Sequence, residues 1–574
     1  MRIKKNTLIT GTIILTVTGL ASRLIGFFYR IFLSRLFGEE NMGIYQLIGP
    51  VMALVFSLSA AGLQNAISKF VAGETATHDY KASLRILLVG FTFSLTLSAC
   101  CLIGVYNFSD FIASYLLFEP RCAPLLRIAA LSFPFASVHS CINGYFYGVR
   151  KTGVPAATQL TEQLFRVGSV FLIASMCIKE GKEPTIAVAA AGLAIGELSS
   201  MLLALPAAYL HFVKKAYPGG RPPSGTLHRK TTGSGPARLV QAHGRLSRQI
   251  LGFAAPLSAN RLCLNVLQAI EAACIPAKLQ VYGHSVSDSL SVYGVLTGMA
   301  LPLIFFPGTL TNSVSVLLMP AISEADATNN QKVIRKAVRK CLGYCLLLGC
   351  ICLVCFLTFG PTVGRMLYNS EMAGHFIMIL SFMCPFLYLN TTLTSILHGL
   401  GKTGYSFFLN LTSILLRLLF VFQAIPVYGI RGYLAGMLLS QLYTTLCCLI
   451  PLRKYLLPAC TARCRLGATA GRPQGSVGRR PNGGGNSNTS AQTCLKASPE
   501  NLHITFFYII MYADSCIRYR LRRRLPVREG GCPKAGWFSF IRTTRFHFRQ
   551  RYRSDGGAIT AGGRFYFYRG DYVS

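Results

Sequence analysis

Residues 148–153 read GVRKTG and residues 399–404 read GLGKTG, and this repeated hexapeptide decides how the fold is organised. The two copies lie 251 residues apart. At that spacing, eight of the nineteen positions from 148 to 166 are identical to those from 399 to 417. Chance matches between apolar segments favour Leu, whereas these matches include Gly, Lys, Thr and Arg. We therefore expect the chain to contain two copies of one ancestral unit.

The Gly-Lys-Thr in the second copy also ends the phosphate-binding loop of nucleotide hydrolases. That loop needs a first Gly at position 396, where this chain has Ile396. The first copy carries Arg150 where the loop needs the Gly before Lys. Both copies lie between two long apolar runs rather than after a strand. We interpret the hexapeptide as a turn between helices and expect no cofactor.

The composition is that of a membrane protein with many spans. Hydrophobic residues make up 52% of the 574 positions and charged residues only 13%, with a mean hydropathy of +0.45. A soluble protein carries about a quarter charged residues. The apolar run after the basic start Met1-Arg-Ile-Lys-Lys continues past Phe28 without a small-residue cleavage site, so we expect a retained first helix.

Twelve runs have the ~20 apolar residues that a spanning helix needs, so we expect an all-α protein with two six-helix lobes. The expected division is an N-terminal lobe at 1–212, a cytoplasmic basic linker at 213–248 and a C-terminal lobe at 249–455. Six helices per lobe give the copies the same orientation, with a binding cavity between them. The runs cover about 8–34, 44–67, 86–106, 123–147, 155–177, 186–212, 249–275, 291–318, 338–359, 373–398, 405–425 and 430–452.

Loop charges predict the orientation of these spans. Lys and Arg gather in alternate loops, including the N-terminus and the linker, whereas the opposite loops carry Glu39, Glu40 and Asp110. Because basic loops stay in the cytoplasm, we expect the N-terminus and the linker on the cytoplasmic side. The same rule accounts for much of the net charge of +37, so we expect no nucleic acid partner.

Residues 456–574 lose the helical pattern. From 453 to 574 there are 22 Lys and Arg against 5 Asp and Glu, and the run from 504 to 513 is too short to span. One interpretation is a disordered basic cytoplasmic tail that binds anionic lipid. The other is a frameshifted segment under no structural selection.

Ionisable residues inside the spans are the best functional pointers, because burying them in a bilayer is costly. Arg23 and Arg30 are seven apart and share one face of the first helix. Two cations on one wall suit an anionic ligand such as a diphosphate. The alternative is that such side chains extend to the membrane interface, which we favour for Arg35 near the helix end.

The repeat also pairs two intramembrane arginines. Glu162 and Arg166 are spaced to form an ion pair within one helix, which is an alternative to a role in the cavity. Arg417 corresponds to Arg166, but Ser413 replaces the glutamate. We therefore expect Arg417 to be the freer cation.

A polar stripe marks the seventh span, where Arg261, Asn265 and Gln268 recur at helical spacing and Glu271 follows one turn further. We expect it to line a cavity. Glu197 in the sixth span is isolated in sequence, so it is either a proton or cation site or the partner of an arginine on another helix. The 20 cysteines show no repeated C-x-x-C pairs, and we expect no metal site.

Several stretches in this order resemble the stage V sporulation protein B-like and polysaccharide exporter branch of the multidrug, oligosaccharidyl-lipid and polysaccharide (MOP) flippase superfamily. The resemblance covers about residues 5–455. The stretches are SRLIGFFYR (22–30), MGIYQL (42–47), SAAGLQNAISKFVA (59–72), NGYFYG (143–148) through EQLFR (162–166), and YGVLTGMALP (293–302) through LMPAISE (318–324).

The resemblance implies a two-lobed flippase of the bacterial inner membrane that works by alternating access and carries lipid-linked cell-wall or polysaccharide precursors. A cavity arginine of the family's first helix falls at Arg23. A second one, in the related lipid II flippases, falls at Tyr29, next to Arg30. Their eighth-helix arginine has no counterpart, because residues 293–307 are uncharged.

Our leading hypothesis is a non-enzymatic flippase for an anionic lipid-linked saccharide in the bilayer, driven by a coupling cation or the membrane potential. Arg23, Arg30, Arg261 and Arg417 would bind the substrate. One alternative is cation-coupled multidrug efflux, with a carboxylate among Glu162, Glu197 and Glu271 as the coupling site. Another is a non-transporting envelope or sporulation scaffold. A glycosyltransferase is disfavoured, because the pair Glu39-Glu40 has no supporting His or Asp.

Overall fold

The regular structure is helical throughout the described residues, which are 5–76, 80–216 and 236–456 of a computed structural model, and they contain no strand. All of them belong to one unit, Met1–Ala470. Eleven helical segments in these residues are long and apolar enough to cross a membrane. The expected all-α polytopic class is confirmed.

The first of these segments holds two of the expected spans. Ile13–Thr75 has 63 residues, which a straight helix would stretch over about 95 Å, three times the thickness of the hydrocarbon core. The chain changes direction at Gly38, whose φ of 75° is open to glycine without strain. The twelve expected spans therefore match the eleven segments once this kink is taken into account.

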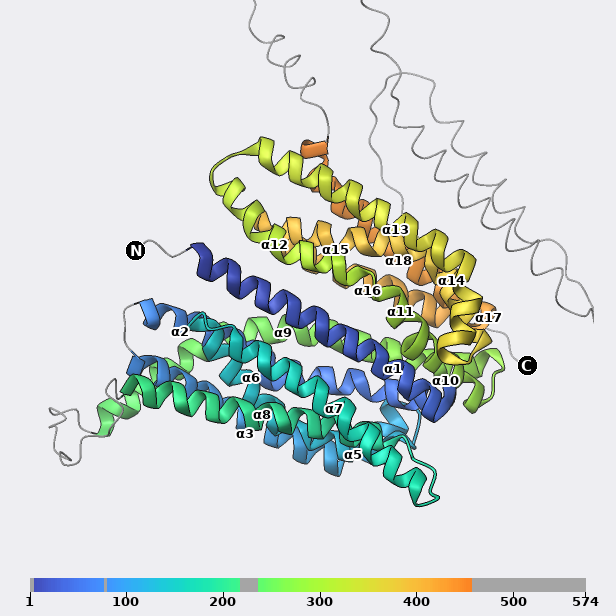
Figure 1. The fold of residues 1–574 in the computed structure, drawn as a ribbon, viewed down its shortest axis with the longest axis horizontal. Helices are drawn as coiled ribbons and strands as arrows, with labels where there is room; N and C mark the ends of the chain where they lie inside the picture. Colours follow the sequence, from blue (N-terminus) through green and yellow to red (C-terminus); the bar gives the residue numbers. More distant parts are fainter. Residues whose placement is uncertain (1–4, 77–79, 217–235, 457–574) are drawn as a thin grey trace, which may run out of the picture. The chain divides into compact units, whose positions relative to one another are not determined.

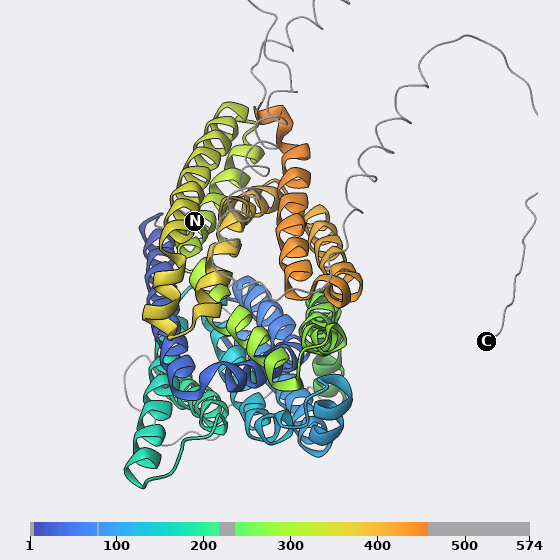
Figure 2. The same cartoon turned by 90° about the vertical axis from the view of Figure 1, so that its right-hand side faces the viewer.

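Figure 1 shows the order of the helices, and Figure 2 shows α3–α8 grouped apart from α13–α18, while α1 reaches toward α13. The first half consists of α1 (Lys5–Phe56), η1 (Ser57–Ala61), α2 (Gly62–Ala76), α3 (Tyr80–Asn107), α4 (Ser109–Phe111), η2 (Ile112–Leu116), α5 (Cys122–Ala130), α6 (Ser132–Gly148), α7 (Gly153–Lys179) and α8 (Ala187–Ala216).

The second half begins with a 47-residue helix, α9, which packs against α2 of the first half and α16 of the second. Its elements are α9 (Pro236–Tyr282), α10 (Val286–Gly294), η3 (Val295–Ala300), α11 (Leu301–Phe305), α12 (Gly308–Ala327), α13 (Gln331–Tyr368), α14 (Glu371–Leu380), η4 (Ser381–Met383), α15 (Cys384–Gly399), α16 (Thr403–Gln423), α17 (Ile425–Tyr428) and α18 (Ile430–Leu456).

Both hexapeptides form the same helix-ending turn. Arg150 and Gly401 adopt left-handed φ angles of 59° and 72°. The N–H groups that follow, from Lys151 and Lys402, each donate to the carbonyl five residues earlier at 2.9 Å. This arrangement is a Schellman motif, which satisfies carbonyls left unpaired at the end of a helix. The sequence is therefore a turn between helices, as expected, and not a phosphate loop.

Helix boundaries follow the same spacing of 251 residues. α6 ends at Gly148 against α2, and α15 ends at Gly399 against α12. α2 and α12 end 251 residues apart, and α3 and α13 begin 251 residues apart. These correspondences support the duplication that the hexapeptides predict.

Two expected segments had the wrong bounds. The linker expected at 213–248 is shorter, because α8 continues to Ala216 and α9 begins at Pro236, where a proline suits the first helical position. The remainder, 217–235, lies outside the described residues. The span expected at 291–318 is interrupted after Phe305, next to Pro307, and the chain remains helical to Ala327. The tail from 457 onward also lies outside the described residues.

The two halves approach closely where α1 meets α10. Gly43 of α1 lies against the backbone of Leu290, and Gly294 of α10 lies against Gly43 in turn. Small residues allow two helix backbones to come together in this way. This part of α1, just after the kink at Gly38, carries Glu39 and Glu40, for which the loop charges predict the non-cytoplasmic side.

Candidate functional site

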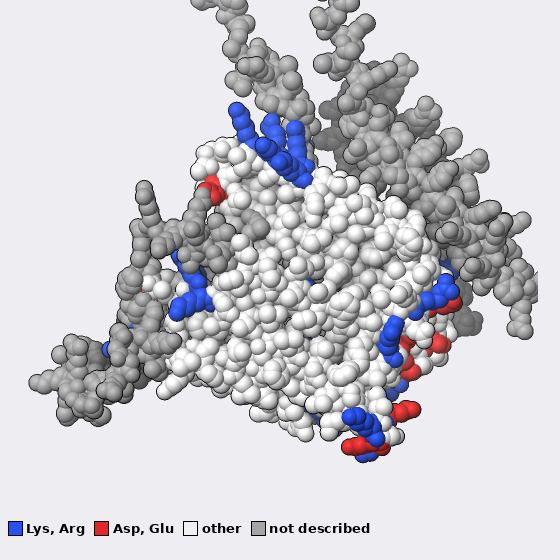
Figure 3. Space-filling model, viewed as in Figure 1, with Lys and Arg blue, Asp and Glu red and all other residues white. Residues whose placement is uncertain are grey.

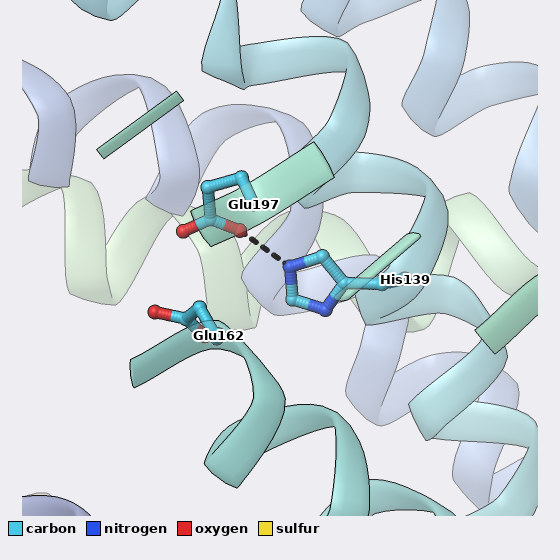
Figure 4. A group of neighbouring side chains, drawn as sticks. All are labelled: His139, Glu162 and Glu197. Carbon is cyan, nitrogen blue, oxygen red and sulfur yellow. Dashed lines mark hydrogen bonds and ion pairs between the residues drawn. The ribbon is translucent and has the colours of Figure 1, made fainter. Parts of the chain in front are cut away.

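Four ionisable side chains form a charge cluster inside the first half, drawn without its arginine in Figure 4. His139 on α6 lies 2.6 Å from Glu197 on α8, measured from Nε2 to a carboxylate oxygen. Arg166 on α7 lies 2.5 Å from Glu162 and 3.7 Å from the other oxygen of Glu197. Each of the four side chains is less than a fifth exposed. One guanidinium thus pairs with two carboxylates in a nearly dry site, so neutrality of the cluster requires one further proton, on the imidazole or on a carboxylate.

Two glycines bring α8 close enough to form this cluster. Gly192 and Gly196 are four residues apart, the spacing of the Gly-x-x-x-Gly contact between membrane helices. A Cβ atom at Gly196 would lie 2.9 Å from the Glu162 carbonyl oxygen and 3.1 Å from the Arg166 Cβ. Since Glu197 follows directly, the close packing of α7 and α8 places its carboxylate beside Arg166.

Sequence reasoning found part of this cluster. The ion pair expected between Glu162 and Arg166 is present, and Glu197 is a partner of that arginine rather than an isolated carboxylate. His139 was missed, because its partner lies 58 residues away and nothing along its own helix marks it. The remaining signal was a histidine within a span, where ionisable groups are rare.

The cluster has the donor set of a small cation site. His139, Glu162 and Glu197 offer one ligand atom each, and these atoms lie within 4.8 Å of one another. Arg166 already occupies the carboxylates, which disfavours a metal ion and favours exchange of a proton between imidazole and carboxylate. A cavity of about 230 Å³, lined largely by apolar side chains such as Phe56, reaches Glu197.

The second half holds a separate buried ion pair. Arg417 on α16 lies 2.8 Å from Glu271 on α9, and a second nitrogen donates to the other oxygen at 3.0 Å. The Tyr433 hydroxyl on α18 donates to the same carboxylate at 2.9 Å. The expectation that Arg417 is the freer cation was therefore wrong. Ser413 removed the partner on its own helix, and Glu271 replaces it from another helix.

The arginines of α1 have different surroundings from these buried pairs. Arg23 lies within hydrogen-bond distance of the Asn312 amide on α12, with 2.7 Å to its oxygen once the amide is turned toward the guanidinium. Arg30 lies in electrostatic range of Arg166, and within the described part of the chain it makes no hydrogen bond or ion pair. Neither arginine has a carboxylate partner there.

Arg35, which we expected to extend to the membrane interface, is exposed and also binds another helix. Its guanidinium donates to the Leu367 carbonyl at 2.7 Å and to the Met366 carbonyl. These are the last carbonyls of α13, which have no partner within their own helix. Arg35 therefore caps α13 and ties the first half to the second.

The polar residues that form a stripe on α9 have three different kinds of surroundings. Asn265 donates to the Ala53 carbonyl at 3.1 Å and to the Ser57 hydroxyl at 2.6 Å, so it joins the two halves. Arg261 and Gln268 are exposed and make no ion pair or hydrogen bond within the described ranges. Glu271, by contrast, is buried in the pair with the α16 arginine described above.

A further polar link joins the halves beside the contact of α1 with α10. Glu40 accepts from Arg121 at 2.7 Å and from the Ser287 hydroxyl of α10 at 2.7 Å. Arg121 also pairs with Glu119 at 2.7 Å. The hydrogen bond to Glu119, reinforced by Glu40, raises the pKa of the Arg121 guanidinium above its ordinary value. We call Arg35, Glu40, Arg121 and Ser287 the outer latch.

Comparison with known proteins identifies the architecture. The family model described as polysaccharide biosynthesis protein matches residues 8–326, and the MatE model matches residues 280–422. Stage V sporulation protein B of Bacillus subtilis (strain 168) is 28% identical over 77% of this chain and 83% of its own length.

Two solved structures share the fold. Lipid II flippase MurJ in its inward closed conformation is 14% identical, with a TM-score of 0.57 over 80% of this chain and 94% of its own. An inward-facing multidrug resistance MATE family transporter of the MOP superfamily is also 14% identical, with a TM-score of 0.55 over 78% of this chain and 96% of its own.

Proposed function

The chain belongs to the polysaccharide biosynthesis protein family, with the fold of the MOP transporters, and we propose that it moves an anionic lipid-linked saccharide across the bacterial inner membrane. Its relative stage V sporulation protein B and the lipid II flippase of shared fold point to an envelope precursor. In the proposed cycle the cavity between the lobes opens to each side in turn, and the substrate undergoes no chemical change.

The observation that carries this proposal is the contrast between two sets of arginines. Arg166 and Arg417 are buried and neutralised by carboxylates. Arg23, Arg30 and Arg261 have no carboxylate partner within the described residues. Unneutralised cations near a bilayer core are costly, and an anionic ligand such as a diphosphate would relieve that cost.

The proposed substrate site therefore differs from the set expected from the sequence. Arg23 and Arg30 on α1, with Arg261 on α9, supply the positive charge, and Gln268 supplies a neutral hydrogen-bonding group. Arg417 leaves the set, because Glu271 satisfies it. Asn265 holds α9 against α1 through Ala53 and against η1 through Ser57, and we assign it a positioning role.

In the proposed cycle, this structure corresponds to the state in which the outer latch is closed. The latch closes the end of the molecule that carries Glu40, for which the loop charges predict the outer side. A substrate would then enter from the cytoplasmic side, where lipid-linked precursors are made, and opening of the latch would release it.

We assign the energy coupling to the charge cluster of the first half. A proton arriving at Glu197 would weaken its bonds to His139 and Arg166 and loosen α8 against α7. Replacing Glu197 with Gln should reduce transport driven by a pH gradient and leave substrate binding unchanged. If the Gln variant responds to the gradient as the unaltered chain does, this assignment is wrong.

Binding by the purified protein tests the substrate class directly. A short-chain polyprenyl-diphosphate saccharide is titrated against the unaltered chain and against R23A, R30A and R261A, with R431A on the exposed start of α18 as the control. Each of the first three should weaken binding about tenfold or more, as expected for lost hydrogen bonds to a charged group. The control should bind normally. Equal affinity in all four variants would contradict the proposal.

Cation-coupled drug efflux remains the second candidate, and one observation favours it. The cavity of about 230 Å³ beside Glu197 is lined mainly by apolar side chains, including Met52, Phe133 and Leu193, and such a site suits a small organic cation. The charge of the ligand that binds distinguishes the two candidate functions. A lipophilic cation that binds the purified chain and is lost in E197Q, while the diphosphate shows no binding, would favour efflux.

A further inference from the structure

The first three turns of α13 carry five cations on one face. Lys332, Arg335, Lys336, Arg339 and Lys340 recur at helical spacing and alone line a surface hollow of about 270 Å³. Figure 3 shows basic side chains gathered at the end of the molecule where α13 begins. We call this set the α13 basic face.

Four of the five cations on the α13 basic face have no acidic partner within the described residues. Within the described residues, Lys332, Arg335, Lys336 and Lys340 form no ion pair. The opposite face of the same turns is fixed in the interior, because Ile334 and Val338 are buried in an apolar cluster. The helix therefore cannot rotate to hide its cations, and like charges at neighbouring positions repel one another.

The corresponding helix of the first half carries fewer cations at the matching positions. α3 begins 251 residues before α13 and carries Lys81 and Arg85 where α13 has Lys332 and Lys336. At the positions of the other three cations, α3 has Leu84, Leu88 and Val89. Two basic residues thus suffice to orient one copy, and the second copy adds three more.

The length of α13 places these cations at the membrane boundary. Its 38 residues extend about 57 Å, nearly twice the hydrocarbon thickness. We therefore expect the apolar part of the helix to occupy the bilayer and its basic first turns to stand among the lipid headgroups. Clusters of four to eight cations next to a membrane span attract anionic lipids.

We propose that the α13 basic face binds the headgroups of anionic phospholipids in the adjacent leaflet. The five cations match phosphate diesters in charge, and the adjoining span holds the acyl chains alongside. This surface is separate from the arginines proposed for the substrate, so either assignment can fail without the other.

Photocrosslinking tests the site in the full-length protein reconstituted in phosphatidylcholine nanodiscs. A phosphatidylglycerol analogue with a photoactivatable group is added, and captured peptides are mapped by mass spectrometry. We expect capture within residues 331–343. The variant R335Q/R339Q/K340Q should reduce it about tenfold, because each cation adds to the attraction of an anionic surface. The variant K81Q/R85Q on α3 is the matched control and should leave this capture unchanged.

Further arms separate lipid from other anions. R335K/R339K keeps the charge and should keep the capture, which distinguishes lost attraction from damage to the fold. Millimolar inorganic phosphate or an oligonucleotide should not displace the lipid. The proposal is overturned if the triple variant captures as much as the unaltered chain, if a phosphatidylcholine probe labels the same peptides equally, or if either soluble anion abolishes labelling.

Discussion

Two arginines at corresponding positions in the halves are neutralised in different ways. Arg166 takes Glu162 from its own helix and Glu197 from the next, whereas Arg417 takes only Glu271 from α9. The first arrangement surrounds the arginine with groups that can accept a proton. The second is an ion pair with a single carboxylate, which a tyrosine hydroxyl also binds. We infer that the first half holds the responsive site and the second half a structural one.

Breaking the structural pair should therefore destabilise the protein. Replacing Glu271 with Gln leaves the guanidinium of Arg417 buried without its counter-charge, which costs about 3–5 kcal/mol for a buried pair. The purified variant should melt at a lower temperature in detergent. The double variant E271Q/R417M, which removes both charges, should recover part of the loss. A single variant that melts like the unaltered chain would show that the pair contributes nothing to stability.

At the scale of helices, the apolar runs predicted the fold, and the long-range partners of the charges could not be predicted. Arg35 binds carbonyls more than 330 residues away, and Arg417 binds a carboxylate 146 residues away. No pattern within one helix reveals such contacts. The predicted helix boundaries were wrong where a local residue preference mattered more than hydropathy. Pro236, for example, starts α9 inside the expected linker.

The packing of α7 on α8 gives a test at this scale. Gly196→Leu would force α8 away from α7, because even a Cβ atom there lies 2.9 Å from a backbone oxygen. Overpacking of this kind costs about 1–3 kcal/mol or more. Gly168→Leu on α7 is the matched control, since nothing lies within 4 Å of its Cβ position. Thermal unfolding should show a large loss for the first variant only, and equal melting of both would refute the close contact.

At the scale of the whole molecule, the proposed transport cycle requires two lobes that separate at one end while they close at the other. The outer latch joins α1 to α10 and α13 through few polar groups, beside the close packing of Gly43 against Leu290 that must separate with it. The parallel duplication would supply the symmetry for such a motion. Sequence predicted the spacing of the copies, but the closed end depends on contacts between halves that only the structure displays.

Weakening the latch should open that end. In the double variant R35A/E40A, α1 loses its bonds to the end of α13 and to Ser287. Backbone amides of residues 286–294 should then exchange hydrogen faster, while those of α6 keep their protection. Hydrogen exchange with mass spectrometry measures both. Unchanged exchange at α10 would mean that these bonds do not hold the lobes together.

The central claim is that the chain moves an anionic lipid-linked saccharide, and flipping in liposomes tests it most directly. The purified protein is reconstituted with a polyprenyl-diphosphate saccharide, and its transfer between leaflets is followed with and without a membrane potential. We predict transfer faster than in protein-free liposomes, loss of that transfer in R23A/R30A, and no transfer of an analogue with an uncharged head. Transfer no faster than in empty liposomes, or equal transfer by the double variant, would contradict the account.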